Sequence, residues 1–199
     1  MTKTVRTNTD PFQFHYPAGA TIVTSRGRGR GKDNAMAVAW HTAASRKPTI
    51  YLVSISPKRY TYELIAESGE FVVNFMPRDR GDLVAMVAGC SGRDVDKFPE
   101  FQIASSPGSK VGAAVLETAF AAYECKLLGR HTYGDHDLFV GEVVAVQWEP
   151  SAFDSDLMHD VERVPPLMYL GEDHYGTTIG SDYLDRAALV SAARQGSTA

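Results

Sequence analysis

The sequence predicts a mainly β fold, closed as a barrel, with only a few short helices. The first observation is the stretch 119–150, "AFAAYECKLLGRHTYGDHDLFVGEVVAVQWEP", which is typical of two long strands joined near "YGDH". The second is that shorter strand patterns follow one another with Gly-containing turns and few helical segments between them. Long antiparallel strands of this kind favour a β-barrel over a parallel, doubly wound sheet.

Shorter strands are predicted mainly in the first half of the chain. Each is a short run in which apolar side chains alternate or follow one another, bounded by Gly, Pro or polar residues. These strands are expected over residues 19–25, 34–42, 49–56, 70–76 and 165–171. The stretch "RGRGRGKD" lies between the first two and is expected to be their connecting loop.

A helix is predicted after the strand 49–56. Ser56 suits the N-cap, Pro57 suits the first helical position and Gly69 suits the stop. A terminal helix and a frayed tail are expected over 181–199.

A further helix is predicted over residues 77–92. Its apolar residues Leu83, Met86 and Val87 recur on one side, which indicates the face that packs on the barrel. The stretch 94–101, "DVDKFPEF", is expected to continue as irregular structure.

The strand 34–42 is unusual because it does not look like plain core. Met36, Val38 and Trp40 alternate with three alanines, which is the period of a half-buried strand. The pattern then turns polar at His41 and Thr42. If this strand were only part of the core, no cluster of polar residues would be expected at one of its ends.

Composition and charge narrow the class of protein. The chain has 199 residues, 44% hydrophobic and 22% charged, values typical of one soluble domain with a substantial core. A net charge of −4 argues against nucleic acid as a partner. We find no apolar run long enough to span a membrane and no signal peptide, so Cys90 and Cys125 are interpreted as reduced thiols of a cytoplasmic protein.

Common site motifs are absent from the sequence. The six histidines show no metal-ligand spacing, so no metal is expected, and there is no GxSxG nucleophile motif. The chain also has no GxGxxG after a strand and no Walker loop, so a bound nucleotide is not held as in those folds. The basic loop at 26–32 could bind nucleic acid or the phosphate of a nucleotide cofactor. The favoured interpretation is instead a solvated hairpin loop between two strands.

The segment "SPKRYTYEL" has the composition of a phosphate site. Ser56, Arg59 and Thr61 lie where a strand passes into a helix, and free backbone N–H groups, hydroxyls and a guanidinium together bind phosphate. An ordinary capped surface helix has the same spacing and is the favoured interpretation from spacing alone.

Seven motifs, in this order, carry a resemblance to a known family. They are "ATIVTS", "NAMAVAWHT" followed by "SRKPTIYLVSIS", "SPKRYTYELI", "EFVVNF", "CSGRDVDKF", "GDHDLFVGEV" and "PPLMYLG". The chain resembles the flavin reductase-like family of FMN-binding split β-barrels, and within it the flavoredoxin and archaeal ferric reductase type. The resemblance covers residues 15–172 and implies a split barrel of Greek-key type.

The resemblance also implies roles for individual residues. Asn34 and Trp40 match the family strand that lies along the isoalloxazine ring, and the small Ala39 lets that strand approach a flat ring closely, with His41 and Thr42 at the ring's polar edge. Lys97 matches a lysine that reaches the flavin, His136 matches the histidine near the flavin and the nicotinamide approach, and Tyr169 matches an aromatic residue near the ring. The segment that wraps the ribityl chain and phosphate is matched by Ser54, Ser56, Arg59 and Thr61.

The sequence departs from the family at two of these positions. The family often has hydroxyl residues where this chain has Ala37 and Ala39. Some hydrogen bonds to the ribityl chain or phosphate are therefore expected from backbone N–H groups or water.

The activity implied by the resemblance is an FMN-dependent oxidoreductase. NADH or NADPH would reduce the FMN, with His136 on the catalytic side, and the electrons would pass to a small-molecule or protein acceptor. The family also implies a homodimer with the flavin at the interface. The alternatives are a flavoredoxin-like FMN carrier that does not oxidise NAD(P)H efficiently by itself and a binding module without redox chemistry; the set Asn34, Trp40, Thr61, Lys97 and His136 argues against the binding module.

Overall fold

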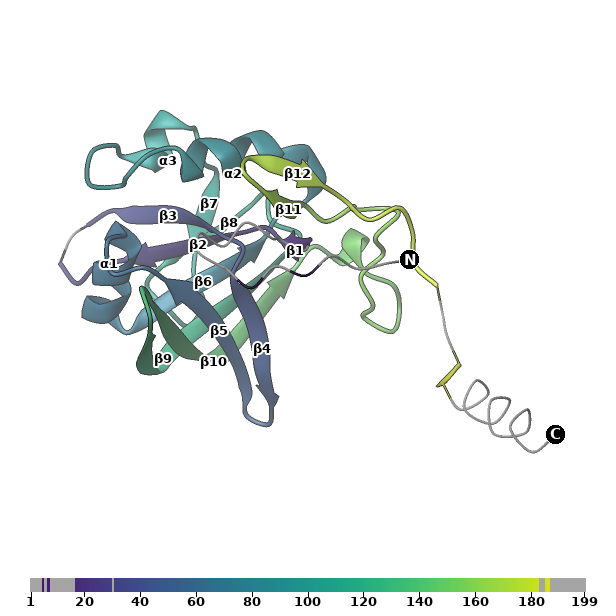
Figure 1. The fold of residues 1–199 in the computed structure, drawn as a ribbon, viewed down its shortest axis with the longest axis horizontal. Helices are drawn as coiled ribbons and strands as arrows, with labels where there is room; N and C mark the ends of the chain where they lie inside the picture. The colour runs from purple at the N-terminus through teal and green to yellow at the C-terminus, as the bar shows by residue number, and fades with distance from the viewer. Residues whose placement is uncertain (1–4, 6, 8–16, 30, 183–184, 187–199) are drawn as a thin grey trace.

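An antiparallel sheet of seven strands, curled into a barrel, forms the centre of the molecule (Figure 1). The computed structural model describes residues 5, 7, 17–29, 31–182, 185 and 186. The strand order is β3-β2-β6-β9-β10-β5-β4. The strands are β2 (Thr21–Arg26), β3 (Asp33–Val38), β4 (His41–Arg46), β5 (Thr49–Ile55), β6 (Glu70–Phe75), β9 (Ala121–Tyr133) and β10 (His136–Trp148).

The two edge strands, β3 and β4, are consecutive in the chain, and this connection closes the barrel. Between them Ala39 and Trp40 cross from one edge to the other. The Ser54 N–H of β5 donates to the Trp40 carbonyl at 2.9 Å, which ties the crossing to the far edge. The mainly β, split-barrel prediction is confirmed.

Smaller elements cover the outside of the barrel. A three-stranded sheet of order β1-β11-β12 and the helices α2 and α3 lie on one side, next to β3 (Figure 1). The remaining elements are β1 (Ala18–Gly19), α1 (Tyr60–Ser68), η1 (Arg78–Arg80), α2 (Gly81–Ala88), α3 (Lys97–Glu100), β7 (Ser105–Pro107), β8 (Ala114–Leu116), η2 (Pro150–Ala152), β11 (Met168–Gly171) and β12 (His174–Gly176).

The hydrophobic core has separate clusters inside and outside the barrel. The inner cluster takes residues from strands all around the sheet and from α1, among them Val53, Phe71 and Phe139. A second cluster, with Ile22 and Val84, fills the space between the sheet, α2 and β11. Alternate residues of the strands thus face two different apolar layers, which is why these strands contain so few polar positions.

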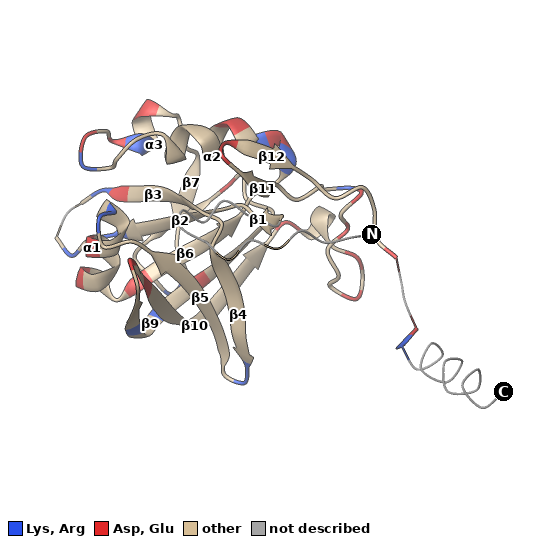
Figure 2. Ribbon diagram, viewed as in Figure 1, with Lys and Arg blue, Asp and Glu red and all other residues tan. Residues whose placement is uncertain are grey.

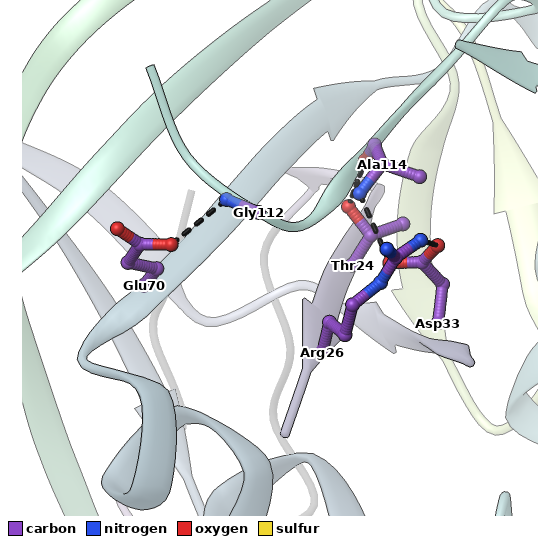
Figure 3. Close-up of polar contacts among 6 residues, drawn as sticks. All are labelled: Thr24, Arg26, Asp33, Glu70, Gly112 and Ala114. Atoms are coloured by element: carbon purple, nitrogen blue, oxygen red, sulfur yellow. Dashed lines mark hydrogen bonds and ion pairs between the residues drawn. The ribbon is translucent and has the colours of Figure 1, made fainter. Parts of the chain in front are cut away.

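The segment 108–116 is held to the sheet by polar contacts that Figure 3 shows. The Gly112 N–H donates to a carboxylate oxygen of Glu70 at 2.8 Å, and the Ala114 N–H donates to Asp33 at 3.1 Å. The Thr24 hydroxyl donates to the Ala114 carbonyl. These contacts fix a segment that has little regular hydrogen bonding of its own.

Residues of both charge signs occur along the described ribbon, with no element coloured by one sign alone over its whole length (Figure 2). In the basic loop, Arg26 pairs with Asp33, and Lys32 lies 3.7 Å from Asp96. The pairing of these two cations supports the interpretation of this stretch as a solvated loop.

Two predicted element boundaries are wrong. The strand expected over 34–42 is two strands, because the chain changes sheet edge at Ala39 and Trp40 without a Gly or Pro to mark it. The first helix begins at Tyr60 rather than Pro57: the Arg59 N–H donates to the Ser56 carbonyl at 3.0 Å, so Ser56 and Pro57 form a turn before the helix. The predicted stop is confirmed, since Gly69 takes φ 72° at the C-cap.

Two other details of the helices differ from the prediction. Met86 is 43% exposed, because α2 buries Leu83, Val84 and Val87 and its apolar stripe is therefore rotated by about one residue. Lys97 begins the short helix α3 within a stretch expected to be irregular. The terminal helix expected over 181–199 falls mostly outside the described residues.

Candidate functional site

Two adjoining cavities lie between β3, α1 and α2. The first, here called the cationic cavity, has a volume of 340 Å³ and is lined by Lys58, Arg59 and Lys97. The second, the aromatic cavity, has a volume of 270 Å³ and is lined by Trp40, His136, Tyr169 and Tyr175. The two share four lining residues, which are Met36, Ala37, Arg59 and Ala88.

The start of α1 forms one wall of the cationic cavity. Arg59 is the N-cap with extended backbone, and no side chain caps the helix. N–H groups in the first turn of a helix have no intrahelical acceptor and carry partial positive charge. Together with the side chains of Lys58 and Arg59, this helix start has the charge and the donors that could hold an anion.

Asn34 and Thr61 form a buried polar pair at the back of the same cavity. The Asn34 amide Nδ2 donates to the Thr61 hydroxyl oxygen at 2.7 Å, so the Thr61 hydroxyl keeps its own hydrogen to donate. The other amide atom, Asn34 Oδ1, is buried and has no partner among the described residues. A buried acceptor without a partner is costly.

Gly92 is required for the shape of this corner. A Cβ atom at position 92 would lie 1.8 Å from Asn34 Oδ1, far inside contact distance. The turn that follows Cys90 therefore packs its backbone directly against the Asn34 side chain. Any larger residue would displace Asn34 or the turn.

Lys97 is 4% exposed and ties α2 to β3. Its ammonium group donates to the Ala35 carbonyl at 2.9 Å and to the Val87 carbonyl at 2.7 Å. Both acceptors are otherwise short of partners, because β3 is an edge strand and Val87 is in the last turn of α2. Burial lowers the pKa of Lys97, and the two carbonyls compensate for part of the lost hydration.

Trp40 and His136 form one side of the aromatic cavity. Trp40 is 48% exposed, and its ring centre lies 4.9 Å from that of His136. His136 Nδ1 hydrogen-bonds to the Asp135 carboxylate at 2.8 Å, and this bond lowers the pKa of Asp135. Since a carboxylate only accepts, Nδ1 carries the hydrogen and Nε2 of a neutral His136 is left as an acceptor.

Most of the predicted site residues line the two cavities. Nine do so: Asn34, Ala39, Trp40, Ser54, Arg59, Thr61, Lys97, His136 and Tyr169. The other three line neither cavity. Thr42 is exposed on β4, Ser56 lies in the turn before α1, and the His41 ring bonds to the Tyr51 hydroxyl and the Gly19 carbonyl, both at 2.7 Å.

Several lining residues were not singled out from the sequence. They are Lys58, Ser91, Gly92, Asp173 and Tyr175. The motif "CSGRDVDKF" contains two of them, and a Gly directly after a helix and a Ser was a usable signal for a close backbone approach. Asp173 and Tyr175 had no such signal, because only the pairing of β11 with β12 brings them to the cavity.

Within the described residues, no group of three or more His, Cys, Asp and Glu side chains is arranged to hold a metal ion. No helix in that part of the chain is both long and apolar enough to cross a membrane.

Known proteins resemble this chain over most of its length. An uncharacterized protein of Aeropyrum pernix is 36% identical over 157 residues, which are 78% of this chain and 58% of that protein, so the chain spans less than two thirds of that relative. The flavin reductase (NADH) of Kitasatospora aureofaciens is 27% identical over 181 residues, 90% of this chain and 85% of that one.

Two solved structures share the fold closely. The FMN-binding protein of Thermus thermophilus with bound 1-cyclohex-2-enone has a TM-score of 0.80 at 34% identity, covering 93% of this chain and 99% of that one. The flavoredoxin of Desulfovibrio vulgaris (Miyazaki F) has a TM-score of 0.80 at 26% identity, covering 94% and 97%. The family model for the flavin reductase like domain matches residues 14–177. The chain therefore belongs to the flavin reductase-like family, as its motifs predicted.

Proposed function

We propose that the two cavities together bind one FMN, with its phosphate in the cationic cavity and its isoalloxazine ring in the aromatic cavity. The observation that carries this proposal is the chemical contrast between two cavities that share a wall. One is lined by three cations and, among the described residues, by no carboxylate. The other is lined by three aromatic side chains, a histidine, Asp173 and the shared Arg59. A ligand with an anionic end and a flat apolar end matches both.

The polar groups between the cavities fit the middle of such a ligand. Thr61 has a hydroxyl hydrogen to donate, and Asn34 Oδ1 needs a donor. A ribityl chain offers hydroxyls that both donate and accept. The small side chains of Ala37 and Ala39 leave room for a flat ring along the end of β3.

The reaction we propose is reduction of bound FMN by NADH or NADPH, followed by electron transfer to an acceptor. When bound, the flavin accepts a hydride and releases electrons singly or in pairs. His136 lines the aromatic cavity and is partly exposed, so its Nε2 could accept a hydrogen bond from a nicotinamide carboxamide. The NADH-dependent flavin reductase among the relatives supports this reaction.

A second candidate is an FMN-containing electron carrier that receives its electrons from another protein. The likeness to the Desulfovibrio flavoredoxin favours it, because the match covers nearly the whole of both chains. In that case His136 would influence only flavin affinity or potential. The Thermus relative, which holds a small enone, instead supports a small-molecule acceptor.

We further propose that the protein acts as a homodimer whose partner covers the ring. Trp40 lines the aromatic cavity and is 48% exposed, and a monomer would leave that apolar surface in water. Mass measured in solution with and without FMN tests this proposal. A stable monomer at full FMN occupancy would contradict it.

The test of the flavin reductase proposal uses the purified protein. The visible spectrum is recorded, the ligand is released by heat and identified by mass, and NADH or NADPH is then added without oxygen. We expect FMN, and bleaching of its absorbance within seconds to minutes by one nicotinamide. Haem or FAD in place of FMN would overturn the ligand assignment, and FMN that neither nucleotide bleaches would favour the electron carrier.

A further inference from the structure

Part of the wall of the aromatic cavity is built by the β11–β12 hairpin. Tyr169 and Tyr175 are cross-strand partners on this hairpin, with ring centres 5.5 Å apart. Asp173 lies in its turn at φ 61°, and all three residues line the aromatic cavity. The wall therefore brings phenols and a carboxylate to the lining of the aromatic cavity.

Tyr175 has a hydroxyl that is available to a ligand. The side chain is half-buried, and no described residue hydrogen-bonds to its hydroxyl. Burial raises the pKa of Tyr175, and the nearby Asp173 and Tyr169 raise it further. The hydroxyl thus stays protonated at neutral pH and is a hydrogen-bond donor.

The remainder of the cavity restricts the shape and charge of a ligand. Ala37 and Ala39 leave a flat space beside the strand, and Trp40 adds an aromatic surface at its open side. Asp173 is the one carboxylate among the described lining residues. Arg59 also lines this cavity but is assigned to the FMN phosphate, so a second planar molecule stacked on the ring would meet a phenol donor and the negative charge of Asp173, which disfavours an anion.

We propose that this wall binds the electron acceptor, and that the acceptor is a small, neutral, planar α,β-unsaturated carbonyl compound whose carbonyl oxygen accepts a hydrogen bond from Tyr175. The inference rests on the proposed FMN function, since the flavin supplies the electrons. It adds to that function an acceptor class and a residue that contacts the acceptor.

The reaction balances with groups that the proposal names. NAD(P)H would supply the hydride, and the acceptor held at this wall would receive it, with its two electrons, at the β-carbon by way of the bound FMN. The C=C π bond breaks, negative charge moves to the carbonyl oxygen, and the Tyr175 hydroxyl stabilises that charge as an oxyanion donor does. Water entering the open cavity gives a proton to the α-carbon, which completes the saturated carbonyl product.

Asp173 makes the site selective for neutral acceptors. Its carboxylate repels a carboxylate-bearing acceptor at close range, so Asp173→Asn should raise the rate with 4-carboxycinnamaldehyde, relative to that with cinnamaldehyde, by about fivefold. An unchanged ratio would show that Asp173 has no part in acceptor selection.

The main experiment measures only the second half of the reaction. FMN-loaded protein is photoreduced without oxygen and mixed with 2-cyclohexen-1-one, and flavin reoxidation and cyclohexanone are followed. We expect the wild type to form cyclohexanone, and Tyr175→Phe to do so about a hundredfold more slowly. Reoxidation of Tyr175→Phe by oxygen should stay within about twofold of the wild-type rate, because that reaction does not need the acceptor's carbonyl.

Tyr133→Phe is the matched control, because Tyr133 is 67% exposed and lines neither cavity. Reduced wild-type protein that oxygen reoxidises but the enone does not would overturn this inference while leaving the FMN proposal intact. Equal enone rates for wild type and Tyr175→Phe would overturn the role of Tyr175. Failure of the protein to hold FMN would instead show up before mixing, as the absence of the flavin spectrum.

Discussion

The ring of His41 hydrogen-bonds within the protein, although His41 was predicted from the sequence to contact the ligand. Its Nε2 lies 2.7 Å from the Gly19 carbonyl, which only accepts, so Nε2 carries the hydrogen. Nδ1 is then the acceptor for the Tyr51 hydroxyl, also at 2.7 Å. Burial lowers the pKa of His41, outweighing the hydrogen bond to Gly19, which raises it. The folded protein therefore prefers the neutral ring.

The lowered pKa of His41 predicts a pH-dependent stability. The His41 ring binds a proton more tightly in the unfolded chain than in the folded protein. Its contribution to the free energy of unfolding is therefore complete above the unfolded pKa of about 6.5, and it is lost as the pH falls toward the lower folded pKa. Urea unfolding at pH 7.5 and pH 5.5 should show a larger loss of unfolding free energy for the wild type than for His41→Gln. The exposed His131, changed to Gln, is the control, and equal losses in His41→Gln and wild type would contradict the account.

Trp40 should contribute to flavin affinity through contact area. A buried aromatic side chain is worth roughly 1.5–3 kcal/mol, and since Trp40 is half exposed we expect Trp40→Ala to weaken FMN binding about tenfold. Quenching of flavin fluorescence on titration measures this affinity. Trp148→Ala is matched in exposure, at 49%, and lines neither cavity, so it should bind FMN like the wild type. Identical affinities for the two variants would place the ring elsewhere.

At the scale of elements, Glu124 of β9 organises the segment 108–112. Its buried carboxylate accepts hydrogen bonds from the backbone N–H groups of Ser109, Lys110 and Val111, and from the side chains of Ser109 and Gln147. Burial by itself would raise the pKa of Glu124, but these hydrogen bonds outweigh it and lower the pKa. One carboxylate thus accepts three consecutive backbone N–H groups of an irregular segment, while Glu70 accepts the next one, from Gly112.

Glu124→Gln should destabilise the protein by about 2–3 kcal/mol, because an amide N–H₂ replaces an acceptor oxygen that faces N–H donors. The pKa of Glu124 is lower in the folded protein than in the unfolded chain. The wild type should therefore have a larger unfolding free energy than Glu124→Gln above the unfolded pKa of about 4.3, and this difference should shrink as the pH falls below it. Urea unfolding at pH 7 and pH 4 measures both effects. Glu117→Gln, at an exposed position, should change the unfolding free energy by less than about 0.5 kcal/mol; an equally small effect at Glu124 would refute its anchoring role.

The positions of the strands could largely be predicted from the sequence, whereas the way the strands are connected in space could not. Apolar periodicity located the strands β2, β5, β6, β9 and β10, because alternate residues of each face a buried layer. It could not show the change of sheet edge at Ala39 and Trp40, which depends on where β5 lies.

The same limit applies to the candidate site. Nine residues matched to family motifs line the cavities, but Asp173 and Tyr175 reach the aromatic cavity only through the pairing of β12 with β11. Spacing alone also could not distinguish Lys97 as a contact to a ligand from Lys97 as a tie between Ala35 and Val87. Such distinctions depend on tertiary contacts between segments far apart in the chain.

At the scale of the whole molecule, the site exists because the barrel closes at its two consecutive edge strands. The free edge of β3 faces α1 and α2, and the two cavities lie along that edge. One end of the site is set by the positive start of α1 and the other by a hairpin outside the barrel. The central claim is that this arrangement recognises the phosphate and the ring of FMN at separate ends.

The most direct test is to titrate the flavin-free protein with FMN and with riboflavin, which differ only in the phosphate. Charge-assisted hydrogen bonds are worth about 1.5–3 kcal/mol, so the account predicts that FMN binds at least about tenfold more tightly than riboflavin. It also predicts that this preference is reduced in Arg59→Met, which removes a cation lining both cavities. Equal affinities of the wild type for FMN and riboflavin, or no binding of either, would contradict the account.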